Sequence, residues 1–230
     1  MRLDRFIESK LAYSAQTVRD LFVQRKVMLN GVLVSEGRGR ITEFCRVEVD
    51  GKVLQAREAI YIMLHKPKGC VSATSDAKNK TVLDLVDIPE KESLHLAGRL
   101  DFNTTGLLLL TNDGKWSRKL TQPQQKIPKT YWVKTQNEIT LGYVKKFSEG
   151  FYFQFEDLTT LPAELNILSS HTALLTIYEG RYHQIKRMFG FFQNEVMELH
   201  RVSIGNIRLD ENLAAGGYRL LTRGELEFVN

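Results

Sequence analysis

The stretch that decides the fold is LHLAGRLDFNTTGLLLLT at residues 94–111, in which two apolar runs flank a polar loop. The runs at residues 94–97 and 107–111 are short, and short apolar runs bounded by turn residues are typical of buried strands. Gly98 and Gly106 bracket the loop between them. The sequence therefore predicts two strands joined by a polar loop.

Further short apolar runs surround this stretch. We expect strands at residues 61–64, 131–133, 151–155, 165–168, 173–178 and 196–199. We expect short helices at residues 116–120, 144–147 and 182–192. Strands adjoin strands more often than they alternate with long helices, which favours an α+β fold over a doubly wound one. The predicted larger domain therefore has a mainly antiparallel mixed sheet flanked by helices.

The N-terminal part predicts a separate helix-helix-hairpin unit. Apolar residues recur on one helical face at Leu3, Phe6, Ile7 and Leu11. Ser14 is suited to cap a second helix. Asn30-Gly31 and Asp50-Gly51 separate short apolar runs, and both positions of such hairpin turns need a positive φ. The polar residues 55–58 read as a linker, so we expect domains at 1–58 and 59–230.

Composition limits the class of protein. The chain has 230 residues, of which 43% are hydrophobic and 26% charged, as expected for a folded protein. Its two cysteines, Cys45 and Cys70, form neither a disulfide scaffold nor a zinc-binding pair. The N-terminus does not resemble a signal peptide, and the apolar run at 107–110 is far too short to span a membrane. We therefore expect a cytoplasmic protein that makes no membrane contact.

Several catalytic motifs are absent from the sequence. It contains no phosphate-binding GxxxxGK[ST] loop, no HExxH zinc motif and no GxSxG nucleophile elbow. The five histidines show no ligand spacing. We therefore expect catalysis, if any, to use side chains alone, without a metal or another cofactor.

Charge is distributed unevenly. The net charge is +5, and residues 1–58 hold 11 basic and 8 acidic groups. Residues 115–137 contain six Lys or Arg, no acidic residue, and the aromatic residues Trp116, Tyr131 and Trp132. Such a stretch suits a phosphate backbone with exposed bases, but it equally fits a solvated face over core aromatics.

Two polar clusters carry the candidate chemistry. Arg99 and Asp101 are two residues apart, so in an extended backbone their side chains project to the same side. The competing interpretation is a capped turn with a surface arginine. The second cluster is GRYHQIKRM at residues 180–188, where a helix starting near Tyr182 would leave Lys186 and Arg187 off the buried face. A solvated basic helix is the competing interpretation there.

Taken together, these clusters resemble a known family. Residues 98–101 (GRLD) with 104–109 (TTGLLL), 129–131 (KTY) and 180–188 occur in the order of the signature blocks of RNA pseudouridine synthases of the RsuA type. The N-terminal unit, with Arg2-Leu3-Asp4, Ser14, Arg19 and VMLNG at 27–31, resembles the S-four RNA-binding domain. The two resemblances cover nearly the whole chain.

The resemblance implies roles for individual residues. Asp101 would be the catalytic carboxylate, Tyr131 would pack against the target base, and Lys186 would be the basic partner of Asp101. Ile185 would lie beneath the uracil, Arg99 would help to displace the target nucleotide, and Arg187 is an alternative to Lys186. Independently of the resemblance, we expect phosphate contacts from Arg2, Arg5, Arg19, Lys115 and Lys129, and the competing interpretation of each arginine is an ordinary solvated charge.

The implied reaction converts uridine to pseudouridine, with no redox change and no net hydrolysis, so it requires no cofactor. The compact form of the chain is similar to that of members that act on 16S RNA. We expect the substrate to be 16S RNA within a small-subunit assembly intermediate. Two alternatives are the same chemistry on large-subunit RNA and a non-catalytic RNA-binding assembly factor. We expect a monomer, because nothing in the sequence suggests a long dimer seam.

Overall fold

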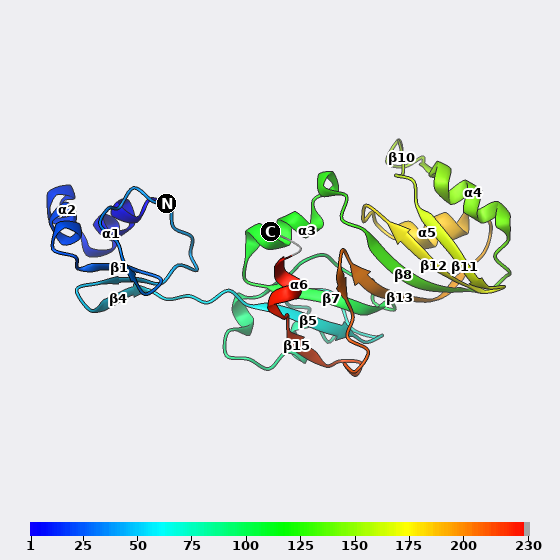
Figure 1. The fold of residues 1–230 in the computed structure, drawn as a ribbon. Coiled ribbons are helices and arrows are strands. Elements are labelled where there is room, and N and C mark those ends of the chain that lie inside the picture. The colour runs from blue at the N-terminus through cyan, green and yellow to red at the C-terminus, as the bar shows by residue number, and fades with distance from the viewer. Residues whose placement is uncertain (228–230) are drawn as a thin grey trace. The chain divides into compact units, whose positions relative to one another are not determined.

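The computed structural model describes residues 1–227. The chain divides into two compact units, Met1–Ala59 and a second that begins at Ile60 (Figure 1). The division lies one residue beyond the polar residues 55–58, the first of which ends β4, the last strand of the first unit. Each unit is described separately below.

The first unit contains two helices and a four-stranded antiparallel sheet with the strand order β2-β1-β3-β4. Its elements are α1 (Leu3–Leu11), α2 (Ala15–Val23), β1 (Val27–Leu29), β2 (Val32–Leu33), β3 (Val47–Val49) and β4 (Lys52–Gln55). Ser14 caps α2 as predicted, because its Oγ accepts a hydrogen bond from the backbone of Thr17 at 3.1 Å. Asn30 and Gly31 adopt φ values of +50° and +80°, which confirms the hairpin.

Both helices pack against this small sheet. Leu3, Phe6 and Ile7 from α1 join Val18 and Phe22 from α2 in one buried cluster. Strand residues such as Val27, Val47 and Val49 complete it. The first unit thus has a hydrophobic core of its own.

The second unit is built on a nine-stranded sheet, whose main path has the order β11-β12-β8-β13-β7-β5-β15 (Figure 1). These strands are β5 (Tyr61–Lys66), β6 (His95–Leu96), β7 (Thr105–Thr111), β8 (Lys129–Thr135), β11 (Glu164–Ser169), β12 (Thr172–Ile177), β13 (Val196–Ile204), β14 (Ile207–Arg208) and β15 (Tyr218–Leu220). Strand β6 pairs with β7, and β14 pairs with β13. All pairs are antiparallel except β13 with β7, so the predicted α+β fold is confirmed.

The remaining elements of the second unit are short. They are the helices α3 (Gly114–Thr121), α4 (Leu141–Glu149), α5 (Gln184–Gly190) and α6 (Arg223–Glu227), the 3-10 turns η1 (Leu83–Leu85), η2 (Lys91–Ser93) and η3 (Pro123–Gln125), and the strands β9 (Tyr152–Phe153) and β10 (Leu158–Thr159). Strand β9 pairs only with β10, outside the large sheet.

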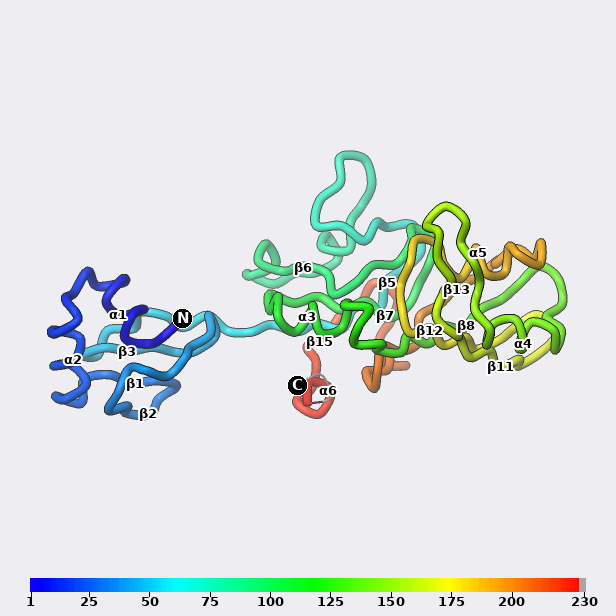
Figure 2. The backbone as a smooth tube through the Cα atoms, turned by 90° about the horizontal axis from the view of Figure 1, so that it is seen from above, coloured from blue at the N-terminus to red at the C-terminus, as the bar shows by residue number. Residues whose placement is uncertain are grey.

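Both faces of the central strands are covered, which explains the unbroken leucine run of β7. Leu108 and Leu110 pack with residues of the long segment between β5 and β6, which Figure 2 shows as a projecting loop. Leu107 and Leu109 point to the other face and pack with Trp116 of α3. A strand buried on both faces has no polar alternation.

A third cluster lies at the β11 end of the sheet. Phe147 of α4 and Phe189 of α5 pack there against Val133 of β8 and Leu175 of β12. The site described next lies where this half of the sheet meets the polar loop that precedes β7.

Two predicted elements are much shorter in the structure than expected. The helix expected at 182–192 is restricted to α5, because His183 adopts a φ of +49° and the helix begins after it. The strand expected at 151–155 shortens to β9, since its pattern of aromatic residues does not reflect one buried face: Phe151 is 2% exposed but Phe155 is 96% exposed.

Candidate active site

Asp101 lies in a loop that several hydrogen bonds fix in place. The Ser72 hydroxyl donates to the Leu100 carbonyl at 2.6 Å and accepts from the Leu100 amide at 3.1 Å. The Lys66 ammonium donates to the carbonyls of Phe102 and Thr104 at 3.2 and 2.9 Å. The carboxylate of Asp101 is therefore presented from a rigid backbone.

Two basic side chains face Asp101. Lys186 Nζ lies 3.2 Å from one carboxylate oxygen, and His183 Nε2 lies 3.4 Å from the other. Lys186 comes from the first turn of α5, whereas His183 immediately precedes that helix. The Asp101–Lys186 pair joins the two polar clusters of the sequence, although Asp101 and Lys186 are 85 positions apart.

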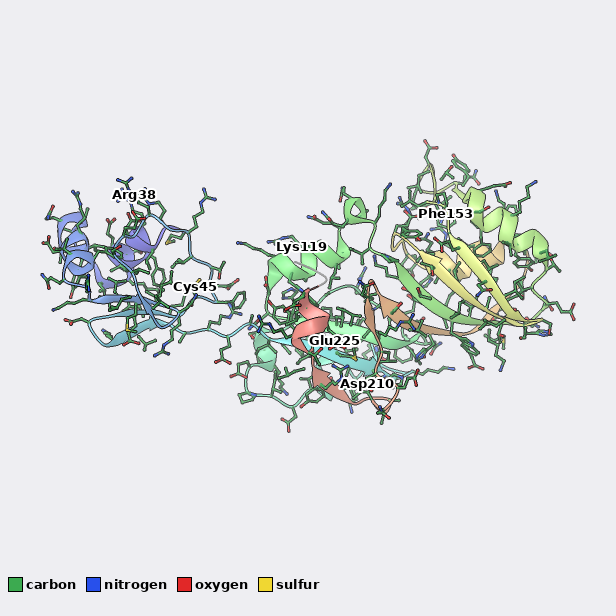
Figure 3. The ribbon with its side chains drawn as sticks, in the orientation of Figure 1. Arg38, Cys45, Lys119, Phe153, Asp210 and Glu225 are labelled. Carbon is green, nitrogen blue, oxygen red and sulfur yellow. The ribbon has the colours of Figure 1, made fainter. Side chains whose placement is uncertain are left out.

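Arg187 points elsewhere. Its guanidinium forms a two-pronged ion pair with Glu156 at 2.6 and 2.8 Å and lies 3.6 Å from the centre of the Phe153 ring. Figure 3 labels Phe153 in this part of the unit. Lys186, rather than the alternative Arg187, is thus the cation that meets Asp101, and Arg187 fastens the β9–β10 hairpin to α5.

A cavity of about 460 Å³ opens beside Asp101. Its lining includes the predicted residues Arg99, Asp101, Tyr131, Ile185 and Lys186. Tyr131 and Ile185 are 7% and 4% exposed, so they form firm walls, whereas Arg99 is exposed. A cavity of this size accommodates a nucleotide-sized ligand.

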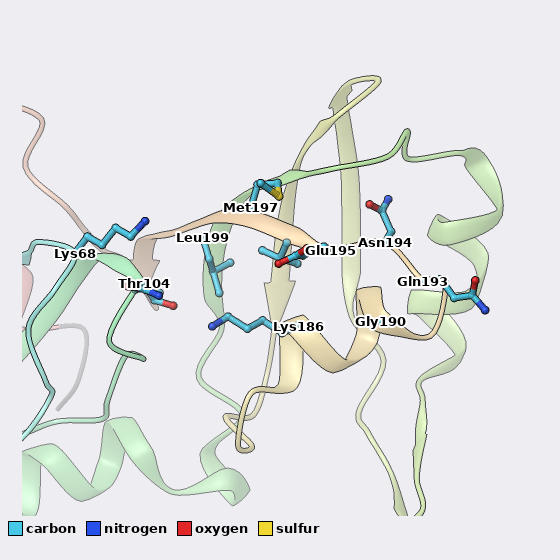
Figure 4. A pocket seen from close by; sticks show the side chains of 11 residues that line it. Lys68, Thr104, Lys186, Gly190, Gln193, Asn194, Glu195, Met197 and Leu199 are labelled. Atoms are coloured by element: carbon cyan, nitrogen blue, oxygen red, sulfur yellow. The ribbon is translucent and has the colours of Figure 1, made fainter.

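A second cavity of about 570 Å³ adjoins the first. Thr104, Lys186 and Leu199 line both cavities. Figure 4 shows Lys186 extending from α5 towards Thr104 and Leu199, with Lys68 farther along. Lys186 therefore stands between the two spaces.

Sequence reasoning missed a buried cation beneath the site, Arg201 of β13. It is 3% exposed, and its Nε donates to the carbonyl of Leu107 at 2.7 Å. Its Nη1 lies 3.4 Å from both Tyr131 Oη and the Arg99 carbonyl. No pattern marked Arg201 out, because a single charged residue on a strand resembles any solvated side chain.

Lys66 is a second buried cation that the sequence did not reveal. Its side chain is fully buried, and burial lowers the pKa of its ammonium group. All three of its hydrogen bonds go to backbone carbonyls, including that of Pro67 at 3.1 Å. Lys66 thus ties the end of β5 to the loop that carries Asp101.

The basic stretch at 115–137 does not form one continuous RNA-facing surface. Trp116 and Tyr131 are core residues. Lys115 is exposed on α3, where Figure 3 also labels Lys119. Lys129 is half-buried and lines the cavity, and burial together with the charge of Arg201 lowers its pKa to about 8. Trp116 and Tyr131 thus fit the core interpretation, Trp132 is half-buried, and the lysines are divided between surface and cavity.

The three candidate arginines of the first unit differ in their surroundings. Arg2 pairs with Asp4, and Arg5 pairs with Glu8 at 2.8 Å. Arg19 is exposed on α2 and takes part in none of the ion pairs formed among residues 1–227. Surface ion pairs of this kind are weak, so they do little to prevent Arg2 and Arg5 from contacting other anions.

Residues 1–227 contain neither a cluster of metal-ligating side chains nor a membrane-spanning helix. No three His, Cys, Asp or Glu side chains come together there as a metal site. None of the helices in that range has the length and apolar character needed to cross a bilayer.

Comparison with known proteins identifies the family of this chain. The model of the family described as RNA pseudouridylate synthase matches residues 60–190, more than half of the chain. The chain belongs to this family. The matched segment contains Asp101, Tyr131 and Lys186, whereas Arg201 lies beyond it.

Full-length relatives agree with this family membership. The chain is 48% identical to ribosomal small subunit pseudouridine synthase A of Pseudomonas aeruginosa, over 98% of this chain and 99% of the relative. It is 42% identical to the protein of the same name from Vibrio vulnificus, over 100% of this chain and 99% of that relative. A crystal structure of a pseudouridylate synthase aligns over the full length of both chains, with a TM-score of 0.73 and 39% identity.

Proposed function

We propose that this protein isomerises one uridine of 16S ribosomal RNA, within a small-subunit assembly intermediate, and that Asp101 is its catalytic carboxylate. The observation that carries the proposal is the placement of Asp101 at a nucleotide-sized cavity, within 3.2 Å of Lys186. The small-subunit target is taken from the names of the full-length relatives. Such a substrate places the enzyme in the cytoplasm.

The reaction explains why a carboxylate is needed. The N1–C1′ bond of uridine breaks, the uracil turns and a C5–C1′ bond forms. C5 then gives up its proton and N1 takes one up, so the product is an isomer of the substrate. A carboxylate at the sugar–base junction supports such a step, as it does at the anomeric carbon in glycosidases. The ammonium of Lys186, 3.2 Å away, pairs with the carboxylate of Asp101 and limits the directions in which it can turn.

The cavity walls supply the rest of the site. The buried ring of Tyr131 would pack against the target base, and Ile185 would support the base from beneath. Because the target base must leave its stack, at a cost of a few kcal/mol, Arg99 at the entrance would help to hold the vacated space open. Contacts to phosphates then offset this cost.

Those phosphate contacts would come from both units. Lys115 and Lys129 belong to the catalytic unit, and Arg2, Arg5 and Arg19 to the first unit. We assign the first unit to affinity and placement on the RNA, because the cavity around Asp101 is lined only by residues of the second.

The experiment that tests the proposal maps pseudouridine in both ribosomal RNAs, from cells with and without the gene. We expect one small-subunit site to disappear without the gene. It should return with the wild-type protein but not with Asp101→Asn, which retains the shape of the side chain and loses its charge. The variant should still bind RNA.

Other outcomes would lead to other conclusions. A site lost from the large-subunit RNA would correct the substrate. An unchanged modification map would favour a binding factor, and full activity of Asp101→Asn would remove this residue from its role.

A further inference from the structure

An aromatic ring stands at the entrance of the Asp101 cavity with no assigned task. Tyr182 lines that cavity, yet 74% of it is exposed. Exposed tyrosines are common on proteins, but this one precedes the residue that contacts Asp101. Its surroundings show that its position is well defined.

A buried carboxylate organises the turn that carries Tyr182. Glu179 is 4% exposed and accepts hydrogen bonds from Arg181 Nε at 2.9 Å, Gln184 Nε2 at 3.0 Å and the Leu161 amide at 2.8 Å. The side-chain oxygen of Gln184 in turn accepts from the Arg181 amide at 3.0 Å. A buried network with several hydrogen bonds holds a turn rigidly, so Tyr182 is held in place before any ligand arrives.

One face of the Tyr182 ring is already occupied. It stacks on His183 with 3.9 Å between ring centres and 19° between planes. His183 adopts a φ of +49° and directs its Nε2 towards Asp101. Asp101, His183 and Tyr182 are thus linked by consecutive contacts. Because Tyr182 is highly exposed, the outer part of its ring is free.

The chemistry of the entrance favours a nucleobase as the occupant of that free face. Arg99 and Lys186 line the same cavity as Tyr182, and cations beside a flat aromatic ring are the combination that single-stranded nucleic acid uses. A nucleotide bonded to an extruded uridine also has to lie at the cavity entrance, because one phosphodiester links the two.

We propose that Tyr182 is a stacking platform for the base of a nucleotide adjacent to the target uridine. The inference rests on the proposed function, and it adds a second point of RNA recognition next to the cavity. Stacking of this kind tolerates different bases, because every base has a flat π face.

The test uses the full-length protein and RNA oligonucleotides that span the mapped target uridine. One oligonucleotide is intact, and two others lack a base immediately 5′ or 3′ of that uridine. Dissociation constants are measured for the wild type, Tyr182→Ala and Tyr182→Phe. Tyr152→Ala is the matched control, because Tyr152 is also exposed, at 60%, but does not line the cavity.

We expect Tyr182→Ala to weaken binding of the intact RNA by about 5- to 150-fold, the range for one stacked base. Tyr182→Phe and Tyr152→Ala should match the wild type. With one of the two abasic RNAs, Tyr182→Ala should cause no further loss. A 2-aminopurine placed at that position should lose fluorescence on binding to the wild type and Tyr182→Phe, but not to Tyr182→Ala.

Two results would overturn the inference. In the first, Tyr182→Ala binds the intact RNA as tightly as the wild type does. In the second, Tyr182→Ala weakens binding of all three RNAs by the same factor, which would mean that Tyr182 only supports His183. Failure of the proposed function is seen separately, as absence of pseudouridine with the wild-type protein, because the stacking test measures binding alone.

Discussion

Lys129 carries its charge in a half-buried position beside the guanidinium of Arg201. Burial, with a smaller contribution from Arg201, lowers its pKa from 10.5 to about 8. Between these values the unfolded chain binds more protons than the folded chain, so this group makes the free energy of unfolding rise with pH. The free-energy cost of burying the charged lysine is fully present below pH 8 and disappears as the pH approaches 10.5.

We therefore predict that Lys129→Met changes how stability depends on pH. The free energy of unfolding of the variant, relative to that of the wild type, should be highest at pH 7. This advantage should shrink steadily up to pH 10. Urea unfolding of both proteins at several pH values measures the difference. Lys115→Met, at an exposed position on α3, should show a constant difference. A difference for Lys129→Met that does not change with pH would contradict the expected titration.

At the residue scale, the sequence was a better guide to which side chains meet than to what holds them in place. The stretches of sequence that resemble the family contain Asp101, Tyr131 and Lys186, and these three residues line one cavity. The choice between Lys186 and Arg187 depended on where α5 begins, which the positive φ of His183 determines and which no periodicity encodes. Arg201 was missed because its burial arises from strand pairing over a long sequence distance.

Among the elements, turns were the most predictable. Asn30-Gly31 and Asp50-Gly51 adopt positive φ values and form the expected hairpins, because the requirement is local. The aromatic run at 151–155 was misleading, since its residues are distributed between core and surface by distant elements. Local chemistry thus fixed the turns, and tertiary packing fixed the extent of the strands.

The parallel pairing of β7 with β13 depends on one glycine. Gly106 has a φ of +105°, and a Cβ there would lie 2.3 Å from the Arg201 carbonyl oxygen. We predict that Gly106→Ala lowers the free energy of unfolding by more than about 1 kcal/mol, because both the conformation and the space are incompatible with a side chain. Because Arg201 contacts Tyr131, activity should fall as well.

Urea unfolding and single-turnover rates check this prediction. Gly114→Ala is the matched control, because it lies at the start of α3 with only the Arg118 guanidinium nearby, at 3.7 Å. That change should be neutral or slightly stabilising. If Gly106→Ala were as stable as the control, the close approach of β7 and β13 would not be essential.

On the scale of the whole molecule, the two units have separate cores. The cluster around Phe6 and Val27 consists only of residues from the first unit, and the three clusters of the second unit contain none from the first. The second unit also contains every residue that lines the Asp101 cavity. This separation lets binding and chemistry be tested independently.

We predict that removing residues 1–59 weakens RNA binding by about tenfold or more at physiological salt, because phosphate contacts from Arg2, Arg5 and Arg19 are lost. For the same reason, the affinity of the shortened protein should depend less steeply on salt concentration. Its single-turnover rate at saturating RNA should stay close to that of the full chain, since Asp101 and Lys186 keep their positions. Circular dichroism confirms first that the shortened protein is folded. A folded protein whose rate collapses at saturation would show that the first unit takes part in the chemical step, and an unchanged salt dependence would show that its arginines do not contact phosphate.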